Sequence, residues 1–542
     1  MKILGLNSAY HESSAALVVD GQVVMAIEEE RLSRRKHGKE ARVDNPDELP
    51  LKAIAACLEA AGGEVDRVAY ALEPGRRRVG GDPYPLEPGN WGTEAGEALF
   101  EAALHRIPEH LGRPVEFLSH HLGHAASAFY PSPFEEAAVL VVDGIGEEAT
   151  TWLGRGNGAE LELLEEIPYP HSLGFVWERV AVYLGFSVYD APKVMGLAAY
   201  GQADRAMPAL DRLLRATDTG FSVDARLARF RSGDVQGLEE LFGPRYQAGQ
   251  SHLEPRFADL AAALQRRTEE IVLVLARRLH RLTGSPNLAY AGGVALNCVA
   301  NARLEREGPF EALYIPGAAH DAGTAVGVAL ELAHRLGAAR RMGPLTPFLG
   351  PAYECEQGTL TSDPAGEAAR CLAESQLVGW FQGRLELGPR ALGHRSLLAD
   401  PRQKDLRAVL NDRIKHREPF RPFAAAVLEE HASDWFDLPV GRKGAVAARD
   451  LMLLAYSVRD ERRSSIPAVV HHDGSCRIQT VSAGTDPLFH RLISEFYRLT
   501  GVPLVLNTSF NDSEPIVCTV EDAVRTYRRS GLDALFVGDR RL

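Results

Sequence analysis

Two histidines four residues apart, His120 and His124, are the residues that point most directly to chemistry. They lie in the stretch SHHLGHAASAF, whose Ala and Ser residues favour a helix with a closely packed face. Positions i and i+4 lie one above the other on a helix, so both imidazoles can point at one atom, and a metal ion is the obvious candidate. Taken alone, the short pattern also suits two structural histidines at the start of a helix.

Two aspartates at the ends of apolar segments can complete such a site. Asp143 ends the run AAVLVVDG, and Asp321 lies in the turn IPGAAHDAGTAVG between a strand and a helix. Two histidines with one or two carboxylates suit Fe2+, Mn2+ or Zn2+ and leave positions open for substrate. The sequence therefore predicts a metal site built from His120, His124, Asp143 and Asp321.

The composition is that of a soluble globular protein. The chain has 542 residues, a net charge of -13 and 45% hydrophobic residues, which suits two or more hydrophobic cores. No segment approaches the roughly 18 uncharged apolar residues of a membrane span, so we expect a cytoplasmic protein without a membrane partner. The acidity disfavours nucleic-acid binding. Six scattered cysteines without a CxxC pair disfavour disulfides and a cysteine-bound zinc.

The elements that would position these residues follow a duplicated plan. Residues 1–39 read as a strand, a polar loop, a second strand, an Asp-Gly turn and a third strand, and the segment from Ala137 repeats that order. Such a duplication is typical of the actin-like (ASKHA) superfold, in which a nucleotide or metal lies between two related halves. Gly292 and Gly293 open a later helix and can bring backbone N–H groups to a phosphate, although such turns often serve only tight packing.

A proline-rich segment divides the chain. Residues 338–358 contain three prolines, which disfavour a helix and suit a semi-rigid connector. We therefore predict an N-terminal domain of residues 1–345 and a C-terminal domain of residues 346–542. The loop 75–92 is rich in Gly and Pro, and we expect it to form a flap over the cleft and to influence the choice of substrate.

The C-terminal domain opens with a cluster of positive charge. Residues 381–423 contain ten Lys and Arg against five Asp and Glu, in a chain whose net charge is -13. Gly and Pro residues among them hold the cations on rigid turns, and arginine forks bind phosphate oxygens through two hydrogen bonds. The segment therefore predicts an anionic ligand, with an exposed basic face as the alternative.

Two later strands add polar groups to the same domain. Arg477 lies inside the strand SCRIQTV, where a charge needs a partner. The strand VPLVLN ends in the polar residues Asn507, Thr508, Ser509 and Asn511. These side chains can form the floor of a ligand site, or they can mark an ordinary exit from a strand into a turn.

Six ordered motifs that span most of the chain carry a family resemblance. They are HHLGHAASAF, MGLAAYG, AGGVALNC, GPRALGHRS, KHREPFRPFA and LNTSFNDSEPIVCT. Together they resemble the NodU/CmcH O-carbamoyltransferases. The resemblance implies an α/β protein with an actin-like (ASKHA) duplicated N-terminal domain, similar to the metal-containing transferase that makes threonylcarbamoyladenosine, and a YrdC-like C-terminal α/β domain.

The resemblance also implies a reaction in two steps. The C-terminal domain would make carbamoyladenylate and pyrophosphate from carbamoyl phosphate and ATP, after phosphate is lost from the carbamoyl donor. The N-terminal domain would transfer the carbamoyl group to an alcohol of a small molecule, and AMP would leave. We expect a secondary metabolite, such as an antibiotic, as the acceptor, Fe2+ or another divalent transition metal and Mg2+ as cofactors, and either a monomer or a homodimer.

Residue roles follow from the same resemblance. His120, His124 and Asp321 would bind the metal, with Asp143 as a fourth ligand or close neighbour, and either His11 or His37 would be the general base for the acceptor alcohol. Nucleotide binding in the N-terminal domain is expected at Gly292, Gly293 and Asn297. Binding of carbamoyl phosphate and ATP is expected at Arg390, Lys415, Arg421, Arg477, Asn507 and Ser509, with Lys415 and Arg421 also catalytic.

The sequence departs from the family pattern in the first loop, which reads HESSA where HDASA is common, so Glu12 reaches one methylene further than Asp. Two other functions stay open. Threonylcarbamoyl transfer to tRNA would use related domains, but the net acidity weighs against it. An actin-like ATPase or sugar-kinase-like module would release ADP and would not need carbamoyl phosphate.

Overall fold

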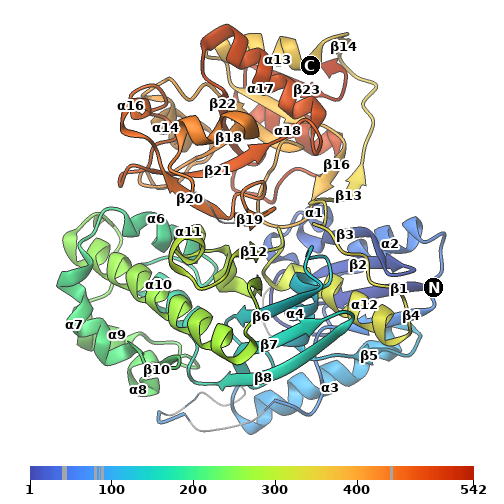
Figure 1. Ribbon diagram of the computed structural model, residues 1–542, viewed down its shortest axis with the longest axis vertical. Helices are drawn as coiled ribbons and strands as arrows, with labels where there is room; N and C mark the ends of the chain where they lie inside the picture. The colour runs from blue at the N-terminus through green and yellow to red at the C-terminus, as the bar shows by residue number, and fades with distance from the viewer. Residues whose placement is uncertain (40–45, 78–81, 85, 87–90, 440–443) are drawn as a thin grey trace.

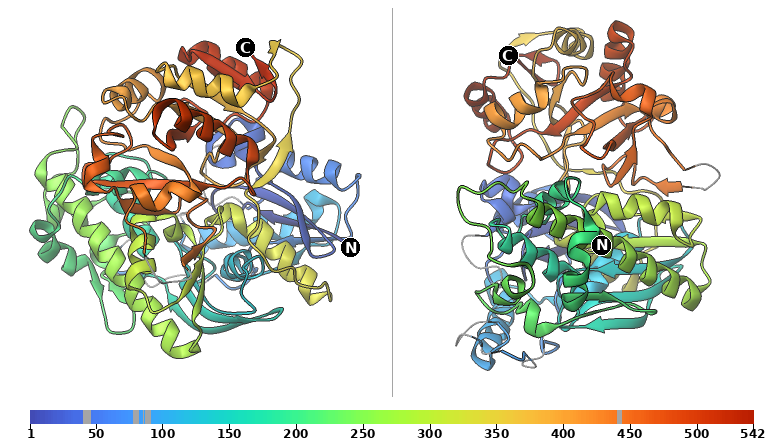
Figure 2. Two further views of the ribbon diagram at one scale, coloured as in Figure 1. Left: turned by 45° about the horizontal axis from the view of Figure 1, so that its top comes forward. Right: turned by 90° about the vertical axis from the view of Figure 1, so that its left-hand side faces the viewer.

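The computed structural model describes residues 1–39, 46–77, 82–84, 86, 91–439 and 444–542. Figure 1 shows the C-terminal part, mainly orange and red, above an N-terminal part that holds two separate sheets. The views in Figure 2 show the same stacking from two other sides.

The first N-terminal sheet has five strands in the order β3-β2-β1-β4-β5. Strand β1 pairs antiparallel with β2 and parallel with β4, so a meander of three strands is followed by a parallel strand. The sheet packs on α2 (Leu51–Ala60). The strands are β1 (Lys2–Asn7), β2 (Ser14–Val19), β3 (Gln22–Glu28), β4 (Arg67–Tyr70) and β5 (Glu116–Phe117).

The second sheet repeats this plan, with β8-β7-β6-β11-β12 in the places of β3-β2-β1-β4-β5. Strand β6 again pairs antiparallel with the next strand and parallel with β11. The strands are β6 (Glu136–Val142), β7 (Ala149–Asn157), β8 (Glu160–Pro168), β11 (Asn287–Ala291) and β12 (Ala312–Tyr314). The helices of this half include α5 (Leu173–Tyr183), α6 (Ala191–Ala198), α7 (Ala203–Leu213), α10 (Pro255–Thr283) and α11 (Cys298–Glu307). The predicted duplication is therefore confirmed.

Two helices, α4 (His120–Phe129) and α12 (Thr324–Arg335), lie between the two sheets. They approach closely because Gly327 has no side chain: a Cβ there would lie 1.8 Å from the carbonyl oxygen of Gly123. Strand β6 reads as a continuous apolar run because α4 covers one face and α10 the other. This packing fixes the first turn of α4, which carries the two histidines.

The C-terminal domain is built on a mixed sheet in the order β14-β24-β23-β15-β17-β22-β18-β21-β20. The pairs β15/β23 and β18/β21 are parallel and the others are antiparallel. Its strands are β14 (Thr359–Leu360), β15 (Val378–Phe381), β17 (Arg395–Ala399), β18 (Ala424–Leu428), β20 (Leu454–Ser457), β21 (Ser475–Val481), β22 (Leu504–Ser509), β23 (Ala534–Val537) and β24 (Arg540–Arg541). Helices α13 (Pro364–Ala373), α17 (Pro487–Thr500) and α18 (Val520–Ser530) pack on it.

The two parts are joined at several places. Strand β19 (Gly444–Val446) leaves the C-terminal domain and pairs parallel with β12, so it extends the second N-terminal sheet. Glu305 of α11 accepts a hydrogen bond of 2.7 Å from Arg449. Strand β13 (Phe348–Ala352) pairs with β16 (Arg384–Glu386), and Arg384 donates to the carbonyl of Val24 at 2.8 Å.

The expected α/β class, with an actin-like duplicated domain and a C-terminal α/β domain, is confirmed. The predicted domain boundary at 345/346 falls between α12 and β13 and stays a prediction. In the predicted flap, residues 78–81, 85 and 87–90 lie outside the described residues. Within the described chain, no helix combines the length and the apolar character that crossing a membrane requires.

Candidate active site

The four residues of the predicted metal site converge on one point. The Nε2 atoms of His120 and His124 each lie 3.4 Å from Asp143 Oδ2, and they lie 3.6 and 3.5 Å from Asp321 Oδ1. The histidines come from the first turn of α4, Asp143 directly follows β6, and Asp321 begins the turn into α12. All four side chains are buried.

The donor set fits a divalent metal ion. Among the described residues, Nε2 of both histidines and Asp321 Oδ1 are buried and have no hydrogen-bond partner. Metal–ligand distances of about 2.0–2.2 Å place the ligands of a tetrahedral ion about 3.3–3.6 Å apart, which matches the observed separations. His120 Nδ1 lies 3.2 Å from the carbonyl oxygen of Ala71, and donation to that oxygen leaves the Nε2 lone pair free for an ion.

The electrostatics of this cluster favour positive charge. Burial lowers the pKa of His120, but the nearby charges of Asp321 and Asp143 outweigh it and raise that pKa well above its ordinary value. Burial raises the pKa of Asp143, but the two imidazoles hold it well below the usual range of an aspartate. A buried pair of ionised carboxylates is therefore stable here only beside cationic charge.

The backbone of the Gly-Gly turn orients Asp143, one of the four residues of this cluster. Gly293 N donates to Asp143 Oδ1 at 2.9 Å. Gly292 has a φ of 92°, and a Cβ there would lie 2.3 Å from the carbonyl oxygen of Val142, so only glycine fits. Asn297 caps α11 by accepting from Ala300 N at 3.0 Å. Nucleotide binding by these three residues stays a prediction.

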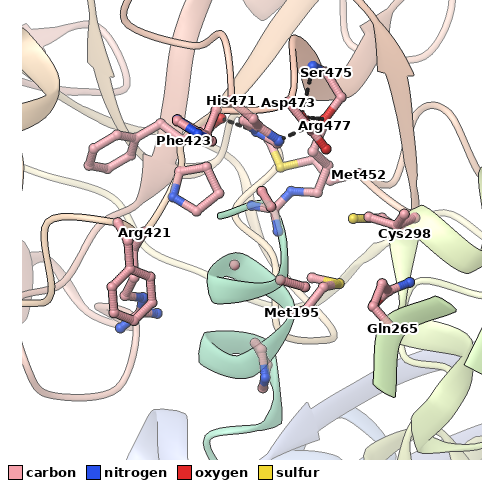
Figure 3. Close-up of a pocket in the computed structure, with 18 of the residues that line it drawn as sticks. Met195, Gln265, Cys298, Arg421, Phe423, Met452, His471, Asp473, Ser475 and Arg477 are labelled. Carbon is pink, nitrogen blue, oxygen red and sulfur yellow. Dashed lines mark hydrogen bonds between the residues drawn. The ribbon is translucent and has the colours of Figure 1, made fainter. Parts of the chain in front are cut away.

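An arginine-lined cavity of about 460 Å³ lies between the two domains. Its described lining holds two acidic residues, Glu269 and Asp473. Figure 3 shows Met195 of α6 in this cavity, between Arg421 on one side and Gln265 and Cys298 on the other. The arginines that line the cavity are Arg266, Arg303, Arg390, Arg407, Arg417, Arg421 and Arg477.

The C-terminal arginines are mutually repulsive. Burial and the neighbouring charges of Arg477 and Arg421 lower the pKa of Arg390 to about 9. The same causes lower the pKa of Arg417 to about 9. Nε of Arg390, Nε of Arg477 and Nη2 of Arg417 are buried and have no hydrogen-bond partner in the described chain. Such a set of uncompensated cations is suited to an anionic ligand.

The predicted ligand floor is formed by neighbouring strands. Ala424 of β18 is opposite Arg477 on one side and Asn507 on the other, so these two side chains share a row across the sheet. Asn507 Nδ2 donates to Gln479 Oε1 at 2.8 Å. Among the described residues, Asn507 Oδ1 has no hydrogen-bond partner although it is buried, and it is available to accept an N–H group.

Lys415 does not line the arginine-lined cavity, nor does it line the second cavity described below. Its Nζ donates to the carbonyl oxygen of Ser509 at 2.5 Å and to the carbonyl and side-chain oxygens of Asn511, both at 2.8 Å. Burial and neighbouring arginines lower its pKa well below the ordinary value. Lys415 therefore holds the end of β22 and the turn after it, and Ser509, the last residue of β22, lines both cavities.

A second cavity of about 580 Å³ lies beside the first. It is lined by His11, His37 and Asp143, and it shares Met195 and Arg421 with the first cavity. No described residue of the predicted flap lines it, whereas residues 187–193 and 514–516 do. The two cavities therefore meet, and one of them reaches the metal cluster.

Sequence reasoning missed part of this site. Arg417 lies in the motif KHREPFRPFA, so its position in a basic motif was a usable signal. Arg266 and Arg303 reach the first cavity from α10 and α11, and the wall 187–193 precedes and begins α6. No local pattern marks these segments, because only the domain packing brings them to the cavities.

Comparison with known proteins agrees with both domains. The Carbamoyltransferase N-terminus family matches residues 2–73 and 97–330, and the Carbamoyltransferase C-terminus family matches residues 369–542. An uncharacterized protein of Synechocystis sp. is 38% identical and covers 98% of this chain and 95% of its own length. The nodulation protein NolNO of Sinorhizobium fredii is 36% identical over 98% of this chain and 79% of its own length.

One further relative and one solved structure complete the comparison. Nodulation protein U of Rhizobium tropici is 30% identical over 94% of this chain and 91% of its own length. The HypF structure from T. kodakarensis is a remote likeness, with a TM-score of 0.32 and 13% identity over 62% of this chain and 48% of HypF. The predicted NodU-type resemblance is thus confirmed by sequence. The chain belongs to the carbamoyltransferase family and is a carbamoyl-transferring enzyme.

Proposed function

We propose that this carbamoyltransferase activates carbamoyl phosphate with ATP in the arginine-lined cavity and transfers the carbamoyl group to an alcohol in the adjoining cavity. The observation that carries the proposal is the shared wall: Arg421 and Ser509 line both cavities, and the second cavity ends at Asp143 of the His/Asp cluster. An activated intermediate formed in one cavity can reach the other without leaving the protein.

The first step forms carbamoyladenylate. Water cleaves carbamoyl phosphate to carbamate and phosphate. A carbamate oxygen then attacks the α-phosphorus of ATP, a new P–O bond forms, and the bond to the β-phosphate oxygen breaks. The products are carbamoyladenylate and pyrophosphate, with Mg2+ accompanying the phosphates.

The lining residues suit this step. Arg390, Arg417 and Arg477 each present a buried N–H group without a partner in the described chain, and they would neutralise charge on phosphate oxygens. Asn507 Oδ1 would accept a hydrogen bond from the carbamoyl amide. Lys415 would act indirectly, because its bonds to Ser509 and Asn511 position the turn between the cavities.

In the second step the acceptor hydroxyl oxygen attacks the carbamoyl carbon, the bond from that carbon to the adenylate oxygen breaks, and AMP leaves. His120, His124, Asp143 and Asp321 would hold the metal, for which we propose Fe2+ or another divalent transition ion. When bound, the ion supplies Lewis-acid polarisation. We propose a hydroxyl of a secondary metabolite as the acceptor and a cytoplasmic location for the reaction.

The decisive experiment is exchange of labelled pyrophosphate into ATP by the purified chain. We expect exchange only when carbamoyl phosphate is present, and AMP as the nucleotide product when a suitable alcohol is added. Release of ADP without any need for carbamoyl phosphate would instead support an actin-like ATPase or kinase-like activity and would refute the proposal.

A further inference from the structure

The ring of His37 is held in one orientation by its surroundings. Its Nδ1 lies 2.6 Å from Glu12 Oε1, and its backbone N donates to Glu30 Oε2 at 2.9 Å. One face of the ring stacks on Tyr189, with centroids 3.9 Å apart and an angle of 21° between the planes. A ring fixed at Nδ1 and on one face presents Nε2 as its remaining reactive atom.

The backbone brings Glu12 and His37 together in strained conformations. Glu12 has a φ of 53° and His37 a φ of 64°, which place both in the left-handed region that side-chain-bearing residues rarely adopt. The two loops are linked by a hydrogen bond of 3.3 Å from Ser13 N to the carbonyl oxygen of His37. Strain of this kind persists only where the surrounding structure enforces it, and it concentrates at functional sites.

His11 occupies a different environment. Its Nδ1 is buried, lies 3.9 Å from Asp321 Oδ2 and has no hydrogen-bond partner in the described chain. His11 therefore faces a residue of the metal cluster. His11, Glu12 and His37 line the same cavity, and the side chains of His11 and His37 are 29% and 26% exposed. Of these two rings, His37 is the one whose Nδ1 is bonded to a carboxylate that is not part of the His/Asp cluster, which leaves its Nε2 to meet a ligand.

We propose that Glu12 is a positioning residue that orients His37, and that Nε2 of His37 removes the proton of the acceptor hydroxyl. The inference rests on the proposed function and deepens it. As the hydroxyl oxygen forms its bond to the carbamoyl carbon, its proton moves to Nε2, and the bond from the carbamoyl carbon to the adenylate oxygen breaks. The imidazolium then returns its proton to the departing AMP phosphate or to water. Glu12 takes no proton and stabilises the imidazolium.

The charges around the ring agree with this role. Burial lowers the pKa of His37, but the hydrogen bond and charge of Glu12 outweigh it, so that pKa lies above its ordinary value. Burial raises the pKa of Glu12, but His37 lowers it to about 2. The other titratable or charged groups beside the ring in this cavity include Glu30, Arg31, Lys36, Tyr189, Asp190 and Lys193. Because Glu30 pairs with Arg31 and Asp190 with Lys193, Glu12 is the carboxylate bonded to the ring.

The first test measures the ring itself. In the full chain labelled at histidine Cε1, NMR titration gives the pKa of His37, whose signal is identified by its loss in His37→Gln. We expect Glu12→Gln to lower this pKa and Glu12→Asp to lower it too, because Asp is one methylene shorter. Glu514→Gln removes another carboxylate that lines the cavity without touching His37, and it should leave the pKa unchanged. An unchanged pKa in Glu12→Gln would overturn the inference.

The second test compares the rate of carbamoyl transfer to an alcohol with the rate of transfer to a nucleophile that needs no general base. Carbamoyl transfer to glycerol should fall about 10²- to 10⁴-fold in His37→Gln, the usual contribution of general base catalysis. In Glu12→Gln it should fall about 10- to 100-fold, as for a misplaced catalytic group. Transfer to hydroxylamine, which attacks as a neutral amine, should stay within a few-fold of wild type in both variants. Equal loss with both nucleophiles would indicate a merely structural role and refute the inference.

The proposed function is tested separately by pyrophosphate exchange in the same preparations. Exchange that depends on carbamoyl phosphate in wild type and in both variants shows that activation is intact. Absence of exchange in wild type would refute the proposed function, whereas the NMR titration would still decide whether Glu12 controls His37.

Discussion

Replacement of Arg390 by Met should stabilise the protein while it impairs activation. Nε of Arg390 is buried without a hydrogen-bond partner in the described chain, and burial with neighbouring arginines lowers the pKa of Arg390 to about 9. At about 1.4 kcal/mol for each tenfold change, this reduction corresponds to a few kcal/mol of unfavourable free energy in the charged state. Because Arg390 borders a water-accessible cavity, we expect a gain of about 1–3 kcal/mol in the free energy of unfolding for Arg390→Met.

The charge of Arg390 should destabilise the folded state at physiological pH. A cation whose pKa is lowered in the folded state destabilises that state at every pH below the lowered value. At pH 7.5 Arg390 is charged, so urea denaturation of wild type and Arg390→Met at that pH should show the whole unfavourable free energy of this charge. Added pyrophosphate should stabilise wild type more than the variant, because each charge-assisted hydrogen bond to phosphate is worth about 1.5–3 kcal/mol. Exchange of pyrophosphate into ATP should fall by about 10- to 100-fold for the same reason.

Arg395 is the matched control. Burial also lowers its pKa to about 10, but its guanidinium donates to the carbonyl oxygens of Gln382 at 2.6 Å and Gly383 at 3.2 Å. Arg395→Met leaves these carbonyls without a donor and should destabilise the protein by about 1–3 kcal/mol. Two results would contradict this reasoning. Arg390→Met could destabilise the protein as Arg395→Met does, or pyrophosphate could stabilise wild type and Arg390→Met equally. Either result would show that Arg390 is not an uncompensated cation in an anion-binding site.

Three further predictions follow from the geometry. His124→Ala should abolish binding of about one divalent metal ion per chain, as measured by elemental analysis; an unchanged metal content would contradict the cluster. Lys415→Met should destabilise the protein by about 1–3 kcal/mol in urea because the oxygens of Ser509 and Asn511 lose their donor; an unchanged stability would show that the turn holds without it. Burial raises the pKa of Glu28 to about 7, although the charge of Arg31 opposes this shift. Between the ordinary pKa of a glutamate and about pH 7, the folded state therefore binds one more proton than the unfolded state. The free energy of unfolding should fall as the pH rises through this range. Urea titrations at several pH values should show that the free energy of unfolding falls less with pH in Glu28→Gln than in wild type. The same dependence on pH in both proteins would count against the raised pKa.

The convergence of the two histidines and two aspartates was predictable from sequence because each of them lies at a position that local rules identify. His120 and His124 share one helix face, and Asp143 and Asp321 follow apolar segments that become a buried strand and a strand-to-helix turn. Their convergence needed only the duplicated fold, whose two sheets enclose α4. The repeated order of strands in the sequence predicted that duplication.

The second cavity was not predictable in the same way. The loop 75–92 as a substrate flap stays a prediction; in its described part, Asp82 bonds Arg231 at 3.1 Å, and the Arg231 guanidinium lies 4.3 Å from the ring centre of Trp91. One described wall of the second cavity is the segment 187–193, whose sequence SVYDAPK carries no recognisable motif. Its position depends on packing against the C-terminal domain, and local sequence rules do not encode contacts between residues more than 200 positions apart.

A chain of charges links the two cavities through that wall. Arg421, which lines both cavities, lies 3.8 Å from Glu418, and Glu418 lies 3.0 Å from Lys193. Lys193 lies 3.3 Å from Asp190, which accepts hydrogen bonds from the backbone N and Oγ of Ser187 at 3.0 and 2.7 Å. The wall of the second cavity begins at Ser187 and contains Tyr189, the residue stacked on His37. Arg421 is therefore connected to this wall through Glu418, Lys193 and Asp190, whose charges alternate in sign.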